Sequence, residues 1–248
     1  MKLPYVIIAA VLAASPACKK QEDRPPPRDS RGSYDSKDST GSASGRGMPT
    51  RLDKPSVPAL PQITKWELDP ENSSVNFVCK HAMHTNVRGM FQRPSGTVVL
   101  DEATPTNSKI NATIDVTTVT TGVDERDTHL KGPDFFDATK YPVITFVSTG
   151  FTKLSDTSYS VTGNLTMHGA TKPVTLAVTA SPPFQHYGTI RRGIEATTSV
   201  NRTDFGVGVA AWNIPAESGG LLVGDNVAIT IDAELVLQAE PGKGGSGH

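Results

Sequence analysis

The chain has 248 residues, of which 24 are Lys or Arg and 25 are Asp or Glu, so its formal net charge is -1. This balance excludes the broad basic field of a nucleic-acid-binding protein, and two cysteines are too few for a disulfide scaffold or a cysteine-based zinc module. No run of about 18 apolar residues is present, which excludes a membrane-spanning helix in the mature protein.

The first predicted element is a signal peptide at residues 1–17. Lys2 supplies a positive start, residues 3–14 an apolar stretch, and residues 15–17 a small-residue exit. The next residue is Cys18, and the segment resembles a bacterial lipoprotein signal, in which a cysteine at this place receives the lipid. We predict lipidation of Cys18; simple cleavage after Ala17 is the alternative. Either outcome predicts a periplasmic or cell-envelope location, and lipidation predicts a membrane anchor.

Residues 19–62 are predicted to form a disordered tether. They contain 7 Pro, 4 Gly and 7 Ser, but only 7 apolar residues. Such a segment cannot bury enough apolar surface to offset the entropy lost on ordering. The Gly-rich residues 241–248 are predicted to be a flexible tail.

The folded domain is predicted to span residues 64–240, where apolar and polar residues alternate. The alternation is clearest over residues 109–116, 159–168, 174–180 and 227–237, and enrichment in Thr, Val and Ile supports strands. One apolar face per strand is typical of an antiparallel sheet with its other face in water. The sequence therefore predicts an all-β domain of about eight antiparallel strands.

A short helical insert near residues 124–138 interrupts this alternation. Asp124 is predicted to cap a helix that Gly132 and Pro133 end, and Phe135 and Phe136 follow directly. We expect the insert to cover one end of a barrel, because closure removes the exposed edges of a sheet. A barrel of this size is either filled by its own side chains or holds one small ligand. The pattern leaves both outcomes open.

Several motif-like sequence blocks follow one another along residues 64–240. They are Trp66-Glu67-Leu68-Asp69, Ser74-Val75-Asn76-Phe77, Val87-Arg88-Gly89-Met90-Phe91, Arg126-Asp127-Thr128-His129-Leu130-Lys131, Asp134-Phe135-Phe136-Asp137, Gly163-Asn164-Leu165-Thr166-Met167-His168-Gly169, Asn201-Arg202-Thr203-Asp204-Phe205-Gly206 and Glu217-Ser218-Gly219-Gly220-Leu221-Leu222-Val223-Gly224-Asp225. In this order, the blocks resemble the YceI family of bacterial periplasmic isoprenoid-binding proteins. One departure is Asn72, where the family often carries His.

The resemblance implies an extended, lipocalin-like antiparallel β-barrel with a long apolar tunnel. In that tunnel an isoprenoid chain, as in a quinone or a polyprenyl phosphate, would be held for storage or transport. The resemblance implies no cofactor besides such a bound lipid, and it leaves homodimer formation open.

The tunnel wall is predicted from apolar residues on the strands and beside the insert. Plain core packing is the alternative for each residue, because a tunnel wall and a core have the same composition. Cys79 is predicted to be a small buried residue in the same row as Val75, with a reactive thiol as the alternative. The predicted wall residues are Val75, Phe77, Met90, Phe91, Phe135, Phe136, Phe146, Leu165, Met167, Phe205, Trp212, Leu221 and Leu222.

Four polar residues are candidates for contact with a lipid head group at the tunnel mouth: His81, Arg126, Asp127 and His129. Arg126 and His129 lie three residues apart and share a helix face. The alternative is that Arg126 and Asp127 pin the insert to the barrel, with Arg88 or Arg202 as partners. No metal site is predicted, because the odd spacing of His81 and His84 on a strand places them on opposite faces.

The motifs of common enzyme classes are missing from the sequence. It has no Gly-x-Ser-x-Gly elbow, and Gly219-Gly220 lacks the Lys and Ser or Thr that complete a phosphate-binding loop. We therefore predict a lipid-binding protein rather than an enzyme. The alternatives are a structural or stress-related envelope lipoprotein without a ligand, and a binder of fatty acids or amides.

Overall fold

The structure of this protein, a computed structural model, describes residues 57–217 and 219–239. The predictions for the signal peptide, for Cys18, for most of the tether and for the tail concern residues outside these ranges.

The described strands are β1 (Ile63–Leu68), β2 (Ser74–His81), β3 (Thr85–Gln92), β4 (Ser95–Asp101), β5 (Lys109–Asp115), β6 (Val119–Thr120), β7 (Val143–Lys153), β8 (Ser158–Met167), β9 (Ala170–Ala180), β10 (Phe184–His186), β11 (Thr189–Asn201) and β12 (Val223–Leu237). The helices are α1 (Asp124–Lys131) and α2 (Val209–Trp212), with short 3₁₀ turns at Pro70–Asn72, Pro105–Asn107, Val116–Thr118 and Arg202–Phe205.

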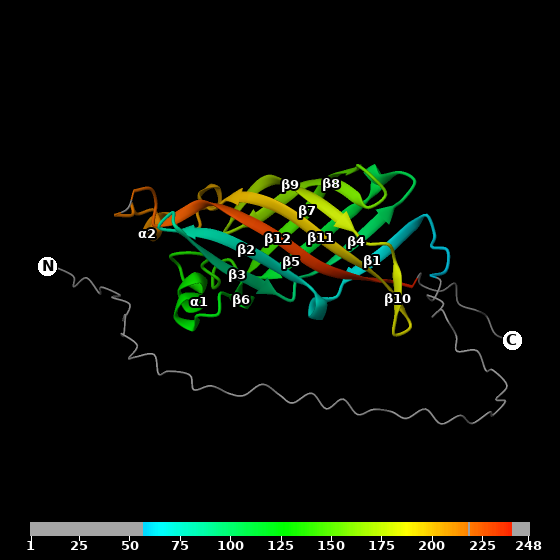
Figure 1. Cartoon of the computed structure of the whole chain (residues 1–248), viewed down its shortest axis with the longest axis horizontal. Coiled ribbons are helices and arrows are strands. Elements are labelled where there is room, and N and C mark those ends of the chain that lie inside the picture. Colours follow the sequence, from blue (N-terminus) through cyan, green and yellow to red (C-terminus); the bar gives the residue numbers. More distant parts are fainter. Residues whose placement is uncertain (1–56, 218, 240–248) are drawn as a thin grey trace, which may run out of the picture. The chain divides into compact units, whose positions relative to one another are not determined.

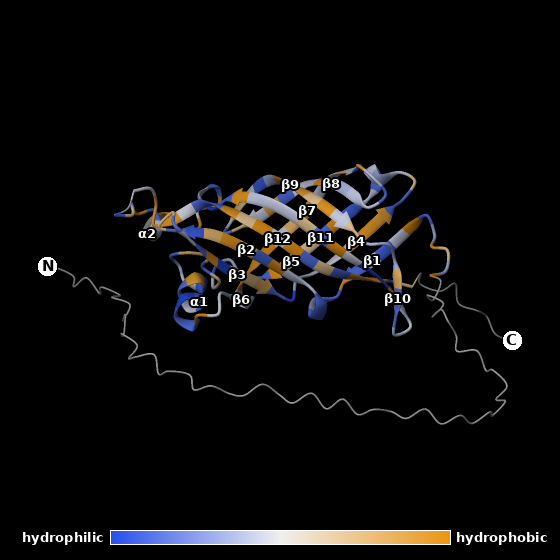
Figure 2. Cartoon of the chain, viewed as in Figure 1, coloured by the Kyte–Doolittle hydropathy of each residue, from blue (hydrophilic) through white to orange (hydrophobic). Residues whose placement is uncertain are grey.

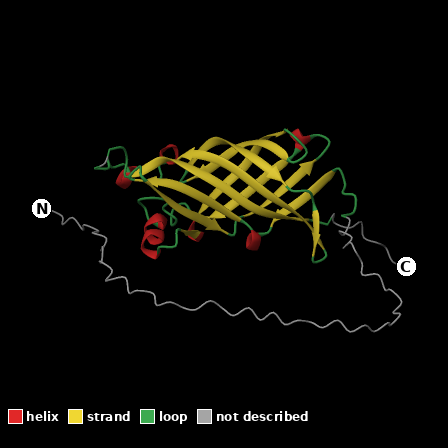
Figure 3. Ribbon diagram, viewed as in Figure 1, coloured by secondary structure: helices red, strands yellow, loops and turns green. Residues whose placement is uncertain are grey.

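The sheet closes into a barrel because β11 pairs with both β9 and β12 (Figures 1 and 3). The strands β11-β9-β8-β7-β5-β4-β1-β12 follow one another and return to β11, and the pairings between them are antiparallel. This confirms the predicted antiparallel barrel of about eight strands. Closure gives each of these strands a partner on both sides, which is the physical reason for expecting a barrel.

The hairpin of β2 and β3 lengthens the barrel at the end that carries α1. β1 pairs with residues 235–237 of β12, while β2 pairs with residues 223–232 of the same strand. β1 and β2 therefore lie end to end along one edge of β12. β3 then pairs with β2, and β4 pairs with β1, so the wall at the α1 end is built from a second pair of strands.

Hydrophobic and hydrophilic residues alternate along the barrel strands (Figure 2), and burial alternates with them, as the period-two pattern predicts. In β8, Tyr159 and Val161 are buried while Thr162 is exposed. The next inward position is Gly163, where a Cβ atom would lie 2.3 Å from the ring of Phe146 on β7. The inward faces therefore meet in an apolar interior, and glycine lets an aromatic ring of that interior lie against the wall.

The predicted helical insert is confirmed as α1, with Gly132 as its C-cap residue. The expectation that Asp124 caps the helix is wrong. Val123 is the N-cap residue and makes no side-chain cap hydrogen bond, while Asp124 already belongs to the first turn. Within the described residues, neither α1 nor any other helix has the length and hydrophobicity that crossing a membrane requires.

The side chain of Arg202 binds backbone groups of the segment between β11 and β12 and of the start of β12. Arg202 is 4% exposed, and its side chain donates hydrogen bonds to the carbonyl oxygens of Val207 (2.9 Å), Val223 (3.0 Å) and Gly224 (3.1 Å). It also pairs with the carboxylate of Asp225 at 2.9 Å. The backbone of an irregular segment needs such partners because it lies outside the sheet ladder.

Candidate functional site

The barrel interior contains an apolar cavity. Its volume is about 190 Å³. Besides Trp66, whose indole N–H donates to Thr64 (2.8 Å), the polar side chains in the wall are Tyr159, Arg192 and Thr198. The rest of the wall is Leu68, Val75, Phe91, Pro94, Val98, Leu100, Ile110, Ala112, Ile114, Ile144, Phe146, Phe151, Leu165, Met167, Val174, Leu176, Val178, Ala180, Ile194, Ala196, Ile229, Ile231, Ala233 and Leu235.

The strands around the cavity are long, and the wall residues extend along them. β8 has 10 residues, β9 has 11, β11 has 13 and β12 has 15. With a rise of about 3.3 Å per residue and a tilt of about 40°, these strands give a barrel roughly 25–35 Å long. On β8 the cavity wall runs from Tyr159 to Met167, eight residues further on, which spans roughly 20 Å at the same rise and tilt. An elongated space of this kind suits an extended apolar chain better than a compact molecule.

An aromatic cluster fills the α1 end of the barrel. It consists of Phe91, His129, Phe135, Phe136 and Trp212, whose contacting ring centroids lie between 5.1 and 5.7 Å apart. Of these five residues, only Phe91 also belongs to the cavity wall. The helical insert therefore adds packed aromatic side chains beside the cavity at the α1 end.

The predicted wall residues divide into three groups in the structure, and their contact with a ligand stays a prediction. Val75, Phe91, Phe146, Leu165 and Met167 line the cavity. Phe77, Phe135, Phe136, Phe205 and Trp212 pack in or against the core at the α1 end. Met90, Leu221 and Leu222 lie apart from both groups: Met90 is 37% exposed on the opposite face of β3 from Phe91, and the two leucines precede β12.

The predicted mouth residues do not line the cavity. Asp127 accepts hydrogen bonds from the backbone N–H of Thr121 (2.7 Å), the hydroxyl of Thr121 (2.5 Å) and the hydroxyl of Thr120 (2.8 Å). Arg126 donates from Nε to the Thr121 hydroxyl at 2.7 Å. These contacts correspond to the alternative in which the pair pins the insert to the barrel. The anchor is the end of β6, in place of Arg88 or Arg202.

The two histidines among the candidate mouth residues lie in different surroundings. Nε2 of His129 lies 2.9 Å from Oδ2 of Asp134, within ion-pair distance. The imidazole ring of His129 packs against Phe135 and Trp212. His81 is an exposed residue at the end of β2. The four candidates therefore do not converge on one point.

Replacing Asp127 with Asn tests the anchoring role. Burial raises the pKa of the Asp127 carboxyl, but the hydrogen bonds from Thr121 and Thr120 outweigh it and hold the pKa below its ordinary value of 3.8. A lowered folded-state pKa stabilises the protein fully above that ordinary value, and the stabilisation is lost as the pH falls through the folded-state pKa.

We expect Asp127→Asn to lower the free energy of unfolding by about 1–3 kcal/mol at pH 7 and by less at pH 3. Urea unfolding at both pH values measures this difference. An equal loss at pH 7 and pH 3 would contradict the stabilising role of the ionised carboxylate.

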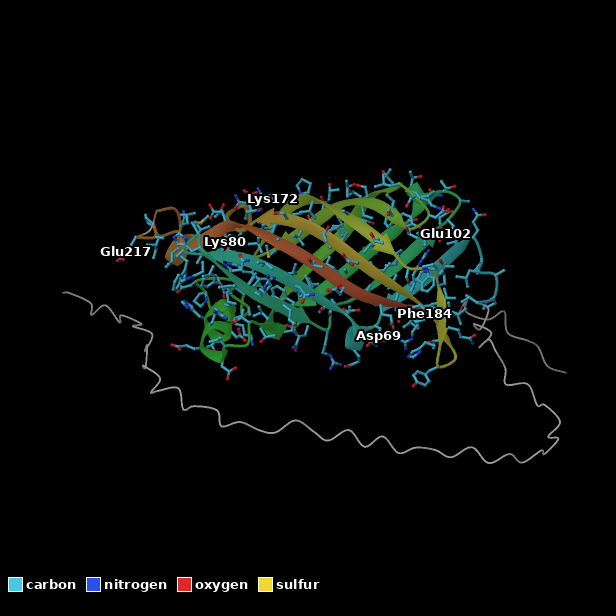
Figure 4. The ribbon with its side chains drawn as sticks, viewed as in Figure 1. Asp69, Lys80, Glu102, Lys172, Phe184 and Glu217 are labelled. Carbon is cyan, nitrogen blue, oxygen red and sulfur yellow. The ribbon has the colours of Figure 1, made fainter. Side chains whose placement is uncertain are left out.

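The end of the barrel that carries β10, called here the β10 end, holds a charged pair. Arg192 is 7% exposed and donates from Nε to the carbonyl oxygen of Ser181 at 2.8 Å. Its Nη1 lies 3.2 Å from Oε1 of Glu102. Figure 4 shows Glu102 and Phe184 at this end. A charged pair therefore lies at the end of the barrel opposite the helical insert, while the surface of the cavity itself is apolar.

The sequence pattern does not single out Arg192 or Tyr159, although a signal for the arginine exists. Arg191 and Arg192 are neighbours in β11, so their side chains must face opposite sides of the sheet. Arg191 faces outward and pairs with Asp69 and Glu234. One arginine of the two had to face the interior, and sequence alone does not say which.

Cys79 and the histidines near it provide no further site. Cys79 is half-buried, its thiol donates to the carbonyl oxygen of Gly224 (3.2 Å), and burial raises its pKa. A raised pKa keeps the sulfur as a thiol, which is the less reactive form. Among the residues that the structure describes, no group of three or more His, Cys, Asp or Glu side chains is arranged to hold a metal ion.

Comparisons with known proteins agree with this architecture. Protein YceI of Shigella flexneri is 38% identical over 144 residues, which cover 58% of this chain and 75% of that protein. The crystal structure of BcnA from Burkholderia cenocepacia matches with a TM-score of 0.59 and 29% identity over 67% of this chain and 98% of that chain. A polyisoprenoid binding domain from Saccharophagus degradans matches with a TM-score of 0.50 and 18% identity, over 70% of this chain and 98% of that chain. At that identity, the last match supports the fold alone.

The family comparison covers the whole closed barrel. The family model described as the YceI-like domain matches residues 66–235. This range begins in β1 and ends in β12, so it includes every strand that lines the cavity. The chain therefore belongs to the YceI-like domain family.

Proposed function

We propose that this protein binds a polyisoprenoid lipid in the barrel cavity and stores or transports it outside the cytoplasm. The observation that carries the proposal is the cavity itself, an elongated space walled by hydrocarbon side chains. The Saccharophagus degradans domain of the same fold is described as polyisoprenoid binding, and that description adds support.

The free energy of burying hydrocarbon favours this type of ligand. One methylene group contributes about 0.8 kcal/mol on leaving water, so a five-carbon isoprene unit contributes roughly 4 kcal/mol before costs are subtracted. Four chain bonds of about 1.5 Å give an extended unit a length of roughly 5 Å. A cavity whose wall spans roughly 20 Å along the barrel is then about four units long. The tail alone supplies enough driving force for tight binding, so no catalytic group is required.

Mass spectrometry of the full-length protein, purified under native conditions from its own cell envelope, tests the proposal. We expect one lipid per chain, and organic extraction should yield fragments that differ by five-carbon isoprene units. An extract dominated by unbranched acyl chains or amides would contradict the proposal in favour of a fatty-acid binder. A protein that stays without lipid after incubation with prenyl lipids would indicate the structural lipoprotein instead.

We also propose that the protein is anchored in the envelope through a lipid on Cys18, with residues 19–62 as the tether. The support is the sequence pattern alone, since these residues lie almost entirely outside the described part of the chain. Cell fractionation of Cys18→Ser should move the protein from the membrane fraction to the soluble extracytoplasmic fraction. Unchanged membrane association in Cys18→Ser would refute the anchor.

A further inference from the structure

Gly163 makes room for the ring of Phe146. Gly163 is buried on the inward face of β8, and Phe146 lies on β7 as the cross-strand partner of Leu165. A Cβ atom on residue 163 would lie 2.3 Å from Cζ and 2.5 Å from Cε2 of the ring. Carbon atoms in contact normally lie about 3.5–4.0 Å apart. The ring of Phe146 therefore occupies the place that a side chain at residue 163 would need.

This contact affects the width of the cavity, because Phe146 belongs to the cavity wall. A barrel of about eight strands has an interior just wide enough for its own side chains to fill. Open space remains only where inward side chains are short or lie close against the strands. The missing side chain of Gly163 lets a bulky phenylalanine lie close against β8, and the space beside the ring stays open.

Short side chains face the cavity in the same part of the barrel. Ala112 on β5 is the cross-strand partner of Phe146 on its other side, and it lines the cavity. Ala196 on β11 also lines the cavity and belongs to the same hydrophobic cluster as Phe146, against which Ala112 packs. This part of the barrel, made of Ala112, Phe146, Gly163 and Ala196, is called here the Phe146 section.

The width of an apolar cavity distinguishes two kinds of hydrocarbon chain. A prenyl chain carries a methyl branch in every five-carbon unit, whereas a straight acyl chain carries none. In a space wide enough to hold it, the branch buries additional apolar surface and makes additional contacts. In a narrower space the same methyl group causes overpacking. The straight chain lacks the branch and tolerates the narrower space.

We propose, resting on the proposed function, that the Phe146 section selects methyl-branched prenyl chains over straight acyl chains. Phe146 touches the lipid, and Gly163 is a positioning residue that holds the ring of Phe146 close against β8. The selection acts on the tail of the lipid through apolar contacts alone, in agreement with the apolar surface of the cavity.

Binding of three alcohols to the full chain tests this inference. The probes are a four-unit prenyl alcohol, its hydrogenated form and the straight-chain alcohol of equal length. The last two differ only in their methyl branches. We expect the wild type to bind both branched probes at least about tenfold more tightly than the straight one, or about 1.4 kcal/mol. Gly163→Ala should weaken the binding of both branched probes about tenfold and that of the straight probe less than about threefold.

The double variant Gly163→Ala with Phe146→Leu tests whether the ring transmits the effect. Leucine lacks the far ring atoms that the added methyl group would meet. The double variant should therefore recover the wild-type preference for the branched probes to within about threefold, as expected for two residues in contact. A double variant no more selective than Gly163→Ala alone would overturn the positioning role of Gly163.

Gly193→Ala is the matched control. Gly193 precedes the wall residue Ile194 in β11 and so faces outward. A Cβ atom there would lie 3.5 Å from Oγ of Ser181, an ordinary contact. The same change of glycine to alanine outside the cavity should leave the affinities of all three probes unchanged, and circular dichroism checks that each variant is folded.

Ala112→Val provides a second measurement that leaves Gly163 in place. It narrows the Phe146 section from the β5 side and should also weaken the branched probes more than the straight one. A wild type without preference among the probes, or an equal loss of all three in the folded variants, would overturn the inference while the proposed function stands. A wild type that prefers the straight chain, or binds none of the probes, would overturn the proposed function itself.

Discussion

Ala196→Phe should reduce lipid binding by at least about 100-fold while the barrel stays folded. Ala196 is 3% exposed and lies in the cavity wall, where it pairs with Val178 of β9 and Ile231 of β12. A benzyl side chain at this position projects into the bore and displaces at least one isoprene unit. That unit contributes roughly 4 kcal/mol, and each 1.4 kcal/mol changes the affinity by about tenfold.

Ala177→Phe is the matched control for this variant. Ala177 is an exposed residue of β9 and pairs with Thr197, the neighbour of Ala196 on β11. Its added ring points away from the cavity, so lipid binding should remain at the wild-type level. Titration with a prenylquinone measures both affinities, and circular dichroism checks that both variants are folded. Equal lipid affinity in the two folded variants would show that the bore is not the binding site.

Arg202→Ala should destabilise the barrel by about 3–5 kcal/mol, the range found when one partner of a buried charge pair is removed. The carbonyl oxygens of Val207 and Val223 would lose their arginine donor, and Asp225 would lose its ion-pair partner. For a domain of this size, each 1 kcal/mol shifts the melting temperature by about 2–4 °C. We therefore expect calorimetry to record a fall of roughly 10 °C.

Arg88→Ala is the matched control, because it removes an arginine side chain of the same charge and length from an exposed position. Arg88 lies on β3 with its side chain exposed, and a surface substitution of this kind usually changes stability by less than about 0.5 kcal/mol. If Arg202→Ala melts within a few degrees of Arg88→Ala, the arginine does not hold the segment between β11 and β12.

The strands were the part of the fold most open to prediction from sequence. Alternation over residues 159–168 and 227–237 predicts β8 and β12, which the structure places at Ser158–Met167 and Val223–Leu237. The reason is physical: a strand with one buried face must alternate, since successive side chains point to opposite sides. The same rule also separates Met90 from Phe91, and the prediction that both line the tunnel overlooks it.

The family blocks proved harder to interpret residue by residue. Asp127 and Arg202 belong to such blocks, and in the structure both bind polar groups of the protein itself. Irregular segments at the end of a barrel need these partners for backbone groups that the sheet does not satisfy. A polar motif can therefore serve to satisfy the backbone groups of an irregular segment as well as to bind a ligand. The sequence does not distinguish these two roles.

The sequence by itself determined that this protein is an antiparallel all-β barrel of the YceI-like kind with a helical insert, because periodicity and local motifs are properties of neighbouring residues. Only the tertiary structure decided which apolar residues line the cavity, as Leu165 does, and which pack away from it, as Phe135 does. It also decided that Arg192 faces inward while Arg191 faces outward. A cavity depends on the separation of side chains from strands that are distant in the sequence, and no local pattern records that separation.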